Sequence, residues 1–360
     1  MSQGQPRSKN THPSQKGPLA GLGGNSSGDW KRRLSAAPER AERQLSLGVL
    51  ATSGKENEFR LPIHPAHFER VDADLRARML LEEGYGEKYG VSDEHLAALV
   101  AGVASRAEII AAADVVLLPK PTRADMEALR YGQVLWGWPH AVQDETLTQI
   151  SIDKRLSVIA WEVMNHWAPN GEFASHVFYE NNEMAGYCSV MHAMSLTGVT
   201  GAYGRALTAA VIGSGCTARD AVKALASLGV PDITVLTTGE AQAFTSPTSS
   251  VTTYHLRRNE SDPSRSTAAT KDGQVPTAGL LAGADIVVNC VLQDTDAPLM
   301  FVTNKELAAF APGSLIVDVS CDASMGFEFA HPTSFTDPMF TVGDGVAYYG
   351  VDHSVSRYLH

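Results

Sequence analysis

The chain has 360 residues, too many for one ordinary hydrophobic core and suited to two domains. Its composition, 44% hydrophobic and 19% charged, is typical of a globular cytosolic protein, and no run reaches the roughly 20 apolar residues of a membrane span. Residues 1–46 carry eight Lys/Arg and three Asp/Glu, so the net charge of −11 leaves −16 on the remainder, which repels nucleic-acid phosphates. We therefore expect a soluble, cytoplasmic protein that binds small molecules rather than nucleic acid or membrane.

The N-terminal segment and the cysteines indicate no cross-linked or metal-bound framework. Residues 1–46 are rich in Ser, Gly, Pro and Gln, which predicts a disordered tail. The four cysteines, Cys188, Cys216, Cys290 and Cys321, form no CxxC or Cys/His pattern. They are predicted to be reduced and buried, and no metal site is expected.

From residue 47 to residue 176, helical patterns alternate with short apolar strands. The helical patterns cover Pro65–Tyr85 and Glu94–Ala104. The predicted strands are Ser46–Thr52, Val115–Leu118, Gln133–Trp138 and Ser157–Trp161. Strands separated by helices favour βαβ units and a parallel sheet, so an α/β substrate domain is predicted over residues 47–176, completed by residues 342–360.

A second α/β unit is predicted over residues 177–341. It opens with a helix over Asn182–Leu196 and a glycine-rich connection over Thr197–Arg205. The strands and helix that follow are Thr208–Ile212, Arg219–Leu228, Ile233–Thr237, Val251–Leu256, Asp285–Cys290 and Ser314–Val319, with a disordered loop predicted over Asn259–Pro276. The expected fold class is α/β, with two Rossmann-like domains, parallel sheets, and a cleft for cofactor and substrate between them.

The sequence GSGCTA lies between a predicted strand and a predicted helix, where a dinucleotide-binding loop is required. Gly213 permits the tight turn, Gly215 lets the backbone approach a pyrophosphate, and Ala218 lets the helix pack closely on the sheet. The helix N-terminus supplies N–H groups and a positive dipole for the phosphates. We predict that this loop binds the cofactor, with Ser214 and Thr217 among the contacts.

The end of the next strand decides between the two nicotinamide cofactors, because an acidic side chain there binds the ribose 2′-hydroxyl and repels a 2′-phosphate. Here Thr237 and Thr238 stand at the strand tip, which favours NADPH. Glu240 is close enough to keep NADH as an alternative. Arg257 or Arg258 would pair with a 2′-phosphate if the intervening loop folded back.

Three cationic or titratable residues of the first domain fall at predicted strand ends and turns: Arg60, Lys120 and His140. A reductase of oxo acids needs a cation for the carboxylate and an acid that protonates the carbonyl or imine as hydride arrives. Arg60 and Lys120 suit the first task and His140 suits the second. Each also has an ordinary structural reading, the two cations as solvated charges and His140 as a packed side chain.

Near the end of the chain, the strand over Ser314–Val319 delivers Asp322 to the carboxyl edge of the second sheet, where ligands of open α/β sheets bind. A turn or cap aspartate is the alternative interpretation. Val291 is a further candidate for contact with the cofactor.

Together these segments resemble the alanine dehydrogenase and transhydrogenase superfamily. The matching motifs are ENEFR, LPKP, GQVLWGWPHA, NNEMAG, GSGCTA and PGSLIVDVSCD. Within the superfamily, NNEMAGY, GAYG and YGVDHS look most like the carboxyethylornithine synthases.

The resemblance implies roles for the candidate residues. Those that match Arg60 and Lys120 hold the pyruvate carboxylate and carbonyl, the one that matches His140 hydrogen-bonds the carbonyl or the developing amine, and the one that matches Asp322 assists proton transfer beside the nicotinamide. Candidates to contact the second substrate are Asn181, Asn182 and Glu183. Glu183 is equally well read as a helix-start residue stabilised by the helix dipole.

The implied reaction condenses pyruvate with the side-chain amine of ornithine or lysine and reduces the imine with NADPH. The product is an N-carboxyethyl amino acid, and a homo-oligomer is expected. An amino acid dehydrogenase that uses ammonia is the alternative. A dinucleotide-binding sensor without turnover is a further one, although a sensor has no need of Arg60, Lys120, His140 and Asp322.

Overall fold

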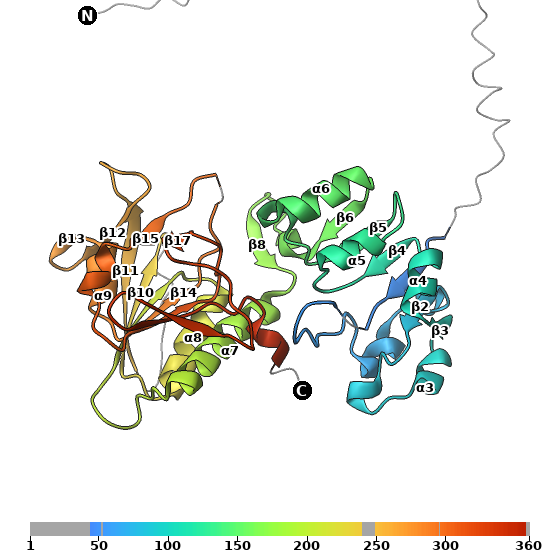
Figure 1. Cartoon of the computed structure of the whole chain (residues 1–360), viewed down its shortest axis with the longest axis horizontal. Coiled ribbons are helices and arrows are strands. Elements are labelled where there is room, and N and C mark those ends of the chain that lie inside the picture. The colour runs from blue at the N-terminus through green and yellow to red at the C-terminus, as the bar shows by residue number, and fades with distance from the viewer. Residues whose placement is uncertain (1–43, 52, 240–248, 295, 358–360) are drawn as a thin grey trace, which may run out of the picture. The chain divides into compact units, whose positions relative to one another are not determined.

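The computed structural model describes residues 44–357, apart from residues 52, 240–248 and 295 (Figure 1). The predicted tail therefore lies almost wholly outside the described residues. Two parallel-sheet units follow one another along the chain, as the α/β prediction requires.

The first unit is a six-stranded, all-parallel sheet in the order β3-β2-β1-β4-β5-β6. Its strands are β1 (Leu47–Val49), β2 (Met79–Glu82), β3 (Gly102–Ala104), β4 (Val115–Leu117), β5 (Val134–Gly137) and β6 (Ser157–Ala160). Its helices are η1 (Pro65–Arg70), α2 (Ala73–Arg76), η2 (Glu87–Tyr89), α3 (Asp93–Ala97), α4 (Arg106–Ala112), α5 (Arg123–Ala128), η3 (Ala141–Gln143) and α6 (Glu145–Asp153).

Alternation along β1 divides the core of this unit between the two faces of the sheet. Leu47 and Val49 join one buried cluster, and Leu50 joins the other together with Ile109 of α4. A Cβ added at Gly48 would lie 2.3 Å from Cγ2 of Ile109, so the glycine lets α4 lie directly on β1.

Two helices predicted from the sequence of this unit are wrong in their extent. The predicted helix over Pro65–Tyr85 contains η1, α2 and the strand β2, and the one over Glu94–Ala104 contains the end of α3 and the strand β3. Both strands are short and follow helical turns directly, so an apolar pattern counted over the whole window runs across the boundary. Pairing with β1 and with each other fixes β2 and β3 as strands.

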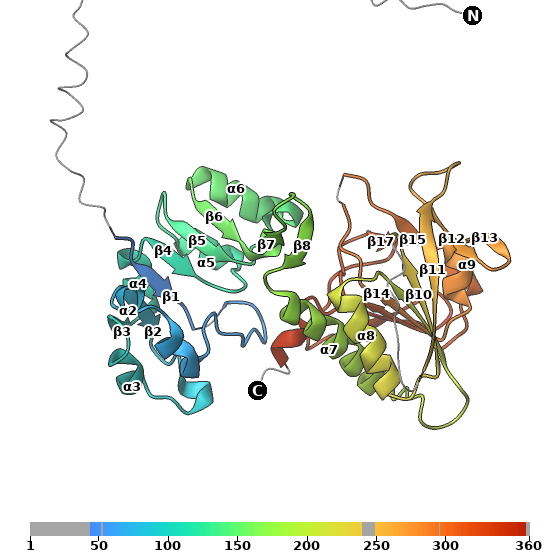
Figure 2. The same ribbon diagram turned by 180° about the vertical axis from the view of Figure 1, so that it is seen from behind.

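A hairpin and a long helix lead into the second unit. The one-turn helix η4 (Trp161–Val163) precedes the antiparallel pair β7 (Asn165–Trp167) and β8 (Phe173–His176), and α7 (Tyr179–Thr197) follows. Helix α7 lies beside α8 (Cys216–Ser227) in both views (Figures 1 and 2). At Gly186 an added Cβ would lie 1.9 Å from the Thr217 carbonyl oxygen, so this glycine permits the close contact between the two helices.

The second unit is a nine-stranded sheet in the order β13-β12-β11-β10-β9-β14-β16-β19-β18. Its parallel strands are β9 (Thr208–Ile212), β10 (Asp232–Thr237), β11 (Ser250–Arg258), β14 (Ile286–Asn289), β16 (Leu315–Asp318) and β19 (Val346–Tyr349). The antiparallel edges are β12 (Ser266–Thr270), β13 (Gly273–Pro276) and β18 (Met339–Val342). Smaller elements are α9 (Thr277–Ala282), β15 (Met300–Val302), η5 (Glu306–Ala309), β17 (Gly326–Phe327) and η6 (Ser354–Arg357).

The second sheet corrects two further predictions. Residues 259–276, predicted to be a disordered loop, include β12 and β13, which continue the sheet from β11 as an antiparallel meander. Residues 342–360 were assigned to the first domain, but β19 pairs with β16 and β18 pairs with β19, so residues 339–349 belong to the second sheet. In both cases hydrogen bonding with a neighbouring strand, which a local pattern does not contain, decides the structure.

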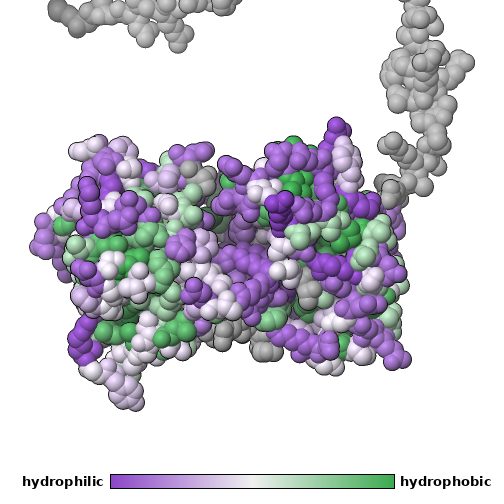
Figure 3. Space-filling view, viewed as in Figure 1, coloured by the Kyte–Doolittle hydropathy of each residue, from purple (hydrophilic) through white to green (hydrophobic). Residues whose placement is uncertain are grey.

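No helix in the described part of the chain is long and apolar enough to cross a membrane. Hydrophilic residues cover much of the face seen in Figure 3.

Candidate functional site

The carboxyl end of the first sheet supports two of the predicted residues. Lys120 follows β4 and His140 follows β5, and because β4 and β5 are parallel neighbours their ends meet at one edge. A Cβ added at Gly137 would lie 1.9 Å from the Leu118 carbonyl oxygen, so this glycine lets the chain after β5 pass close to the segment that carries Lys120.

Arg60 is held in a fixed orientation by three neighbours. Its Nε donates to Glu58 Oε1 at 2.8 Å, its Nη2 pairs with Glu58 Oε2, and its Nη1 donates to Asn181 Oδ1 at 3.0 Å. The guanidinium carbon also lies 4.8 Å from the ring centroid of Trp138, a cation–π distance. Three of the five guanidinium N–H groups bond to described residues in this way, and the other two have no bond within residues 44–357 as described, so they are candidates for an anionic ligand.

Glu58 makes the burial of Arg60 tolerable. Only 9% of the Arg60 side chain and 1% of the Glu58 side chain are exposed. Burial by itself would raise the pKa of Glu58, but the hydrogen bonds and charge of Arg60 outweigh it and hold the pKa below its ordinary value. The pair is therefore ionised and rigid, an arrangement that presents the remaining N–H groups in one direction.

Lys120 has an unusually acidic ammonium group. Burial lowers its pKa to about 8 from the ordinary 10.5, the positive charges of Lys55 and Arg60 act in the same direction, and the carboxylate of Asp352 opposes them. A lysine of this kind exchanges its proton near neutral pH.

His140 is neutral at physiological pH. Burial, followed by the positive charge of Lys120, lowers its pKa to about 3. Its backbone has φ 47°, in the left-handed region that non-glycine residues rarely adopt, and its N–H donates to Glu162 Oε1 at 2.9 Å. A neutral imidazole donates one N–H hydrogen bond, but it is a poor acid, which changes the proton-donor role predicted for this residue.

Asp322 belongs to the second unit and interacts with Lys120. One of its carboxylate oxygens, Oδ2, is buried and has no hydrogen-bond partner among the residues that the structure describes. Burial raises the pKa of Asp322, and the charge of Lys120 lowers it, so the two side chains interact electrostatically. The charge of Lys120 thus acts on both His140 and Asp322, and the charge of Arg60 acts on Lys120 and His140. The structure brings the four predicted residues into one electrostatic neighbourhood.

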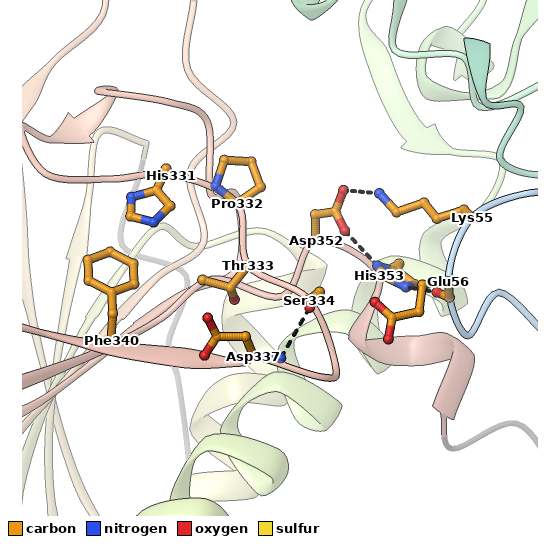
Figure 4. A pocket seen from close by; sticks show the side chains of 10 residues that line it. All are labelled: Lys55, Glu56, His331, Pro332, Thr333, Ser334, Asp337, Phe340, Asp352 and His353. Carbon is orange, nitrogen blue, oxygen red and sulfur yellow. Dashed lines mark hydrogen bonds and ion pairs between the residues drawn. The ribbon is translucent and has the colours of Figure 1, made fainter. Parts of the chain in front are cut away.

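Asp352 and Lys55 are functional candidates that the sequence analysis missed. Lys55 Nζ forms an ion pair with Asp352 Oδ2, and His353 Nδ1 lies 2.6 Å from Asp352 Oδ1 (Figure 4). Burial would raise the pKa of Asp352, but the bond to His353 and the charges of Lys120 and Lys55 hold it well below its ordinary value. The motifs ENEFR and YGVDHS contain or adjoin both residues, and only the distance of about 300 positions between them hid the pair.

A pocket of about 440 Å³ adjoins this pair. It is lined by Lys55, Glu56, His331, Pro332, Thr333, Ser334, Asp337, Phe340, Asp352 and His353 (Figure 4). Figure 4 shows Glu56, Asp337, Asp352 and His331 among the side chains that line this pocket. Three carboxylates against one lysine give this lining an acidic character.

The loop between β9 and α8 has the geometry of a phosphate-binding turn. Gly213 has φ 115°, a conformation reserved for glycine, and Gly215 is the residue before the first turn of α8. A Cβ added at Gly215 would meet no atom within 4 Å, so an open space lies next to the N-terminus of the helix. Ala218 is fully buried against the sheet. An unobstructed helix N-terminus of this kind fits a dinucleotide pyrophosphate.

The strand tip predicted to select the cofactor is only partly described. Thr237 is buried and its hydroxyl donates to Ser214 Oγ at 2.7 Å, whereas Thr238 is exposed. Glu240 lies outside the described residues. Arg258 donates to the carbonyl oxygens of Pro263 and Ala297, at 2.8 and 2.7 Å, so its guanidinium is already engaged.

The remaining predicted contacts lie at two places. Val291 is next to the glycine turn, since a Cβ at Gly213 would lie 3.4 Å from Val291 Cγ2, while Thr217 stands in the first turn of α8. On α7 it is Asn181, not Asn182, whose side chain contacts Arg60. The carboxylate of Glu183 acts electrostatically on Tyr179 and Lys223.

These features define an α/β protein of two units. The first unit carries the cations Arg60 and Lys120, and the second carries a glycine turn of the dinucleotide-binding type. Residues 48–173 match the family described as "Alanine dehydrogenase/PNT, N-terminal domain", and residues 181–358 match "Alanine dehydrogenase/PNT, C-terminal domain". The chain therefore belongs to the alanine dehydrogenase/PNT family of NAD(P)-dependent oxidoreductases.

Similar proteins carry two different names. An "Alanine dehydrogenase" from Mycobacterium tuberculosis (strain CDC 1551 / Oshkosh) is 28% identical over 84% of this chain and 80% of its own length. An "N(5)-(carboxyethyl)ornithine synthase" from Clostridium botulinum (strain Hall) is 24% identical over 87% of this chain and 88% of its own length. The prediction that the synthases are the nearest relatives is thus not supported by identity.

Two solved structures share the fold. One, titled "L-alanine dehydrogenase", has a TM-score of 0.62 at 20% identity and covers 87% of this chain and 86% of its own. A transhydrogenase from Sinorhizobium meliloti has a TM-score of 0.59 at 18% identity and covers 86% of this chain and 87% of its own. This likeness establishes the α/β fold with two parallel-sheet domains.

Proposed function

We propose that this protein uses NADPH to condense pyruvate reductively with the side-chain amine of ornithine or lysine, giving an N-carboxyethyl amino acid. The observation that carries the proposal is the position of Lys120, whose charge acts on both His140 and Asp322 and which Arg60 approaches closely enough to perturb. Such a reaction requires cations that bind the 2-oxo acid, a neutral group that donates a hydrogen bond, and a group that accepts a proton.

The oxo acid binds to Arg60 and Lys120. The two guanidinium N–H groups that bond to no described residue match the two oxygens of a carboxylate, and Glu58 and Asn181 hold the guanidinium in place. The ammonium of Lys120 and the neutral imidazole of His140 donate to the carbonyl oxygen, on which negative charge develops. A neutral His140 avoids a third positive charge beside Arg60 and Lys120.

Proton transfers are divided between Lys120 and Asp322. The substrate ammonium must lose a proton before its nitrogen attacks the carbonyl carbon, and the unpartnered Oδ2 of Asp322 is suited to accept that proton. The carbinolamine oxygen must gain a proton before it leaves as water, and Lys120, with its pKa of about 8, is suited to donate it. The resulting iminium carbon receives hydride, which the nicotinamide supplies when bound.

The amine substrate is proposed to occupy the acidic pocket of Figure 4. Glu56, Asp337 and Asp352 attract a molecule with two amino groups, and a volume of about 440 Å³ suits an amino acid better than ammonium alone. Asp352 also interacts electrostatically with Lys120 and His140, which connects this pocket to the proposed reaction centre.

The proposed cofactor is held by the turn Gly213–Ala218. Ser214, Gly215 and Thr217 line the helix N-terminus for the pyrophosphate, and the exposed Thr238 at the tip of β10 adjoins the ribose. NADPH is proposed over NADH because residues 236–239, at the carboxyl end of that strand, carry no acidic side chain.

A second candidate is an alanine dehydrogenase, in which ammonium replaces the amino acid. The 28% identity with an alanine dehydrogenase favours it. The same residues would bind pyruvate, and the acidic pocket would have no substrate to hold.

The test is oxidation of NADPH, and separately of NADH, measured with pyruvate and ornithine, lysine or ammonium. Activity with ornithine or lysine is expected, and activity with ammonium alone would replace the proposal by the second candidate. Lys120→Met and His140→Ala should each lower kcat at least 100-fold while NADPH binding persists. The matched control is Lys223→Met, which removes an exposed lysine from α8 and should leave turnover unchanged. Full turnover in Lys120→Met would defeat the mechanism.

A further inference from the structure

Asp318 is a buried carboxylate that the proposed reaction does not use. It is the last residue of β16 and has no exposed surface. Its Oδ1 accepts hydrogen bonds from Asn289 Nδ2 and from the Cys321 backbone N–H, each 2.9 Å long, and its Oδ2 accepts from Tyr348 Oη at 2.9 Å. A buried polar group persists only where such partners replace water, so these contacts are part of its design.

These bonds join the ends of three neighbouring strands. Asn289 ends β14, Asp318 ends β16 and Tyr348 belongs to β19. Asn289 in turn accepts a hydrogen bond from the Val291 N–H through its Oδ1, at 3.2 Å. The Asp318 carboxylate is thereby hydrogen-bonded both to Asn289, which precedes the turn at Val291, and to Cys321, which precedes Asp322.

The second of these turns contains a strained residue. Cys321 has φ 42°, a left-handed conformation that a residue with a side chain keeps only where its surroundings impose it. The bond from its N–H to Asp318 imposes it here. The next residue is Asp322, whose buried Oδ2 has no hydrogen-bond partner within the described part of the chain and whose carboxylate interacts with Lys120.

We propose that Asp318 is a positioning residue that fixes the left-handed turn at Cys321 and so aims the Asp322 carboxylate at Lys120. Asp322 is the group that touches the substrate, and Asp318 acts through it. The consequence for turnover rests on the proposed function, whereas the control of the turn does not.

Three variants separate positioning from mere stability. Asp318→Ala removes all three hydrogen bonds, Asp318→Asn keeps an oxygen for Cys321 and Asn289 and offers its N–H₂ to the Tyr348 oxygen, and Tyr348→Phe removes only the bond to Oδ2. Misplacing a proton-transfer group by about 1 Å costs on the order of 100-fold in rate. We expect kcat to fall about 10- to 100-fold in Asp318→Ala and less than about threefold in the other two.

The KM for pyruvate should change little in Asp318→Ala, because Arg60 and Lys120 belong to the first unit. A fall of kcat in Tyr348→Phe as large as in Asp318→Ala would reduce Asp318 to a structural role and overturn the proposal. So would wild-type kcat in Asp318→Ala.

A second readout needs no substrate. Cys321 is buried, 2% exposed, and should resist alkylation by iodoacetamide in the wild type, in Asp318→Asn and in Tyr348→Phe. In Asp318→Ala the released turn should expose Cys321 while Cys188 on α7, as internal control, stays protected. Equal protection of Cys321 in Asp318→Ala would sink the inference even if the wild type proved inactive with every amine, a result that would refute only the proposed function.

Discussion

Gly186 offers the sharpest test of how the second unit is built. It lies within α7, where glycine is about 1 kcal/mol less favourable than alanine, so an ordinary helix would gain stability from Gly186→Ala. Here the new Cβ would lie 1.9 Å from the Thr217 carbonyl oxygen, 2.8 Å from its carbon and 3.1 Å from the Ala221 nitrogen. All three are backbone atoms of α8, which yield only if the two helices move apart.

The magnitude follows from these distances. Overpacking of a core costs about 1 to 3 kcal/mol, and a clash with backbone belongs at or above the upper end. After subtraction of the helix gain, a net loss of about 2 kcal/mol remains, which lowers the melting temperature of a chain of 360 residues by roughly 2 to 4 °C. Since Thr217 lies in the first turn of α8, within the proposed phosphate-binding turn, NADPH affinity should fall as well.

The assay is thermal unfolding with and without NADPH, together with titration of NADPH fluorescence. The matched control is Gly279→Ala in α9, where an added Cβ meets nothing within 4 Å and should raise stability slightly. A Gly186→Ala protein as stable as the wild type, with unchanged NADPH binding, would refute the claim that close approach of α7 and α8 shapes the turn.

Two other predictions concern the turn and the cationic cluster. Gly215→Ala should leave the melting temperature within about 2 °C of the wild type, since no atom lies within 4 Å of the new Cβ. It should nevertheless weaken NADPH binding at least tenfold, because the methyl group fills the space beside the helix N-terminus. NADPH binding as strong as in the wild type would show that the pyrophosphate lies elsewhere. Lys120→Met should raise the melting temperature at pH 7, because a pKa lowered to about 8 means that folding disfavours the ammonium. The native chain releases this proton near pH 8 and the unfolded chain near pH 10.5, so the stability of the wild type rises with pH between these values. The higher melting temperature of Lys120→Met should therefore disappear above pH 10.5. A difference in melting temperature that does not depend on pH would show that it does not come from the buried ammonium.

Much of the architecture follows from local patterns. The apolar runs at 115–118, 133–138, 208–212 and 314–319 predicted β4, β5, β9 and β16 to within a residue or two, because buried parallel strands are continuous apolar segments bounded by turns. GSGCTA predicted the turn between β9 and α8, since only glycine reaches the φ of 115° found at Gly213.

Hydrogen bonding between strands decided what those patterns missed. The strand Ser266–Thr270 has the small polar residues of a loop and becomes β12 only through its hydrogen bonds to β11 and β13. Residues 342–349 of the segment assigned to the first domain belong to the second sheet instead, because β19 pairs with β16 and with β18.

The candidate site divides in the same way. Sequence by itself singled out Arg60, Lys120, His140 and Asp322, because residue type and a place at a strand end are local properties. Only the tertiary structure revealed the ion pair of Lys55 with Asp352, the choice of Asn181 as the partner of Arg60, and the neutral state of His140. Each depends on charge and burial contributed by residues far away in the chain, and electrostatic interactions act through space rather than along the sequence.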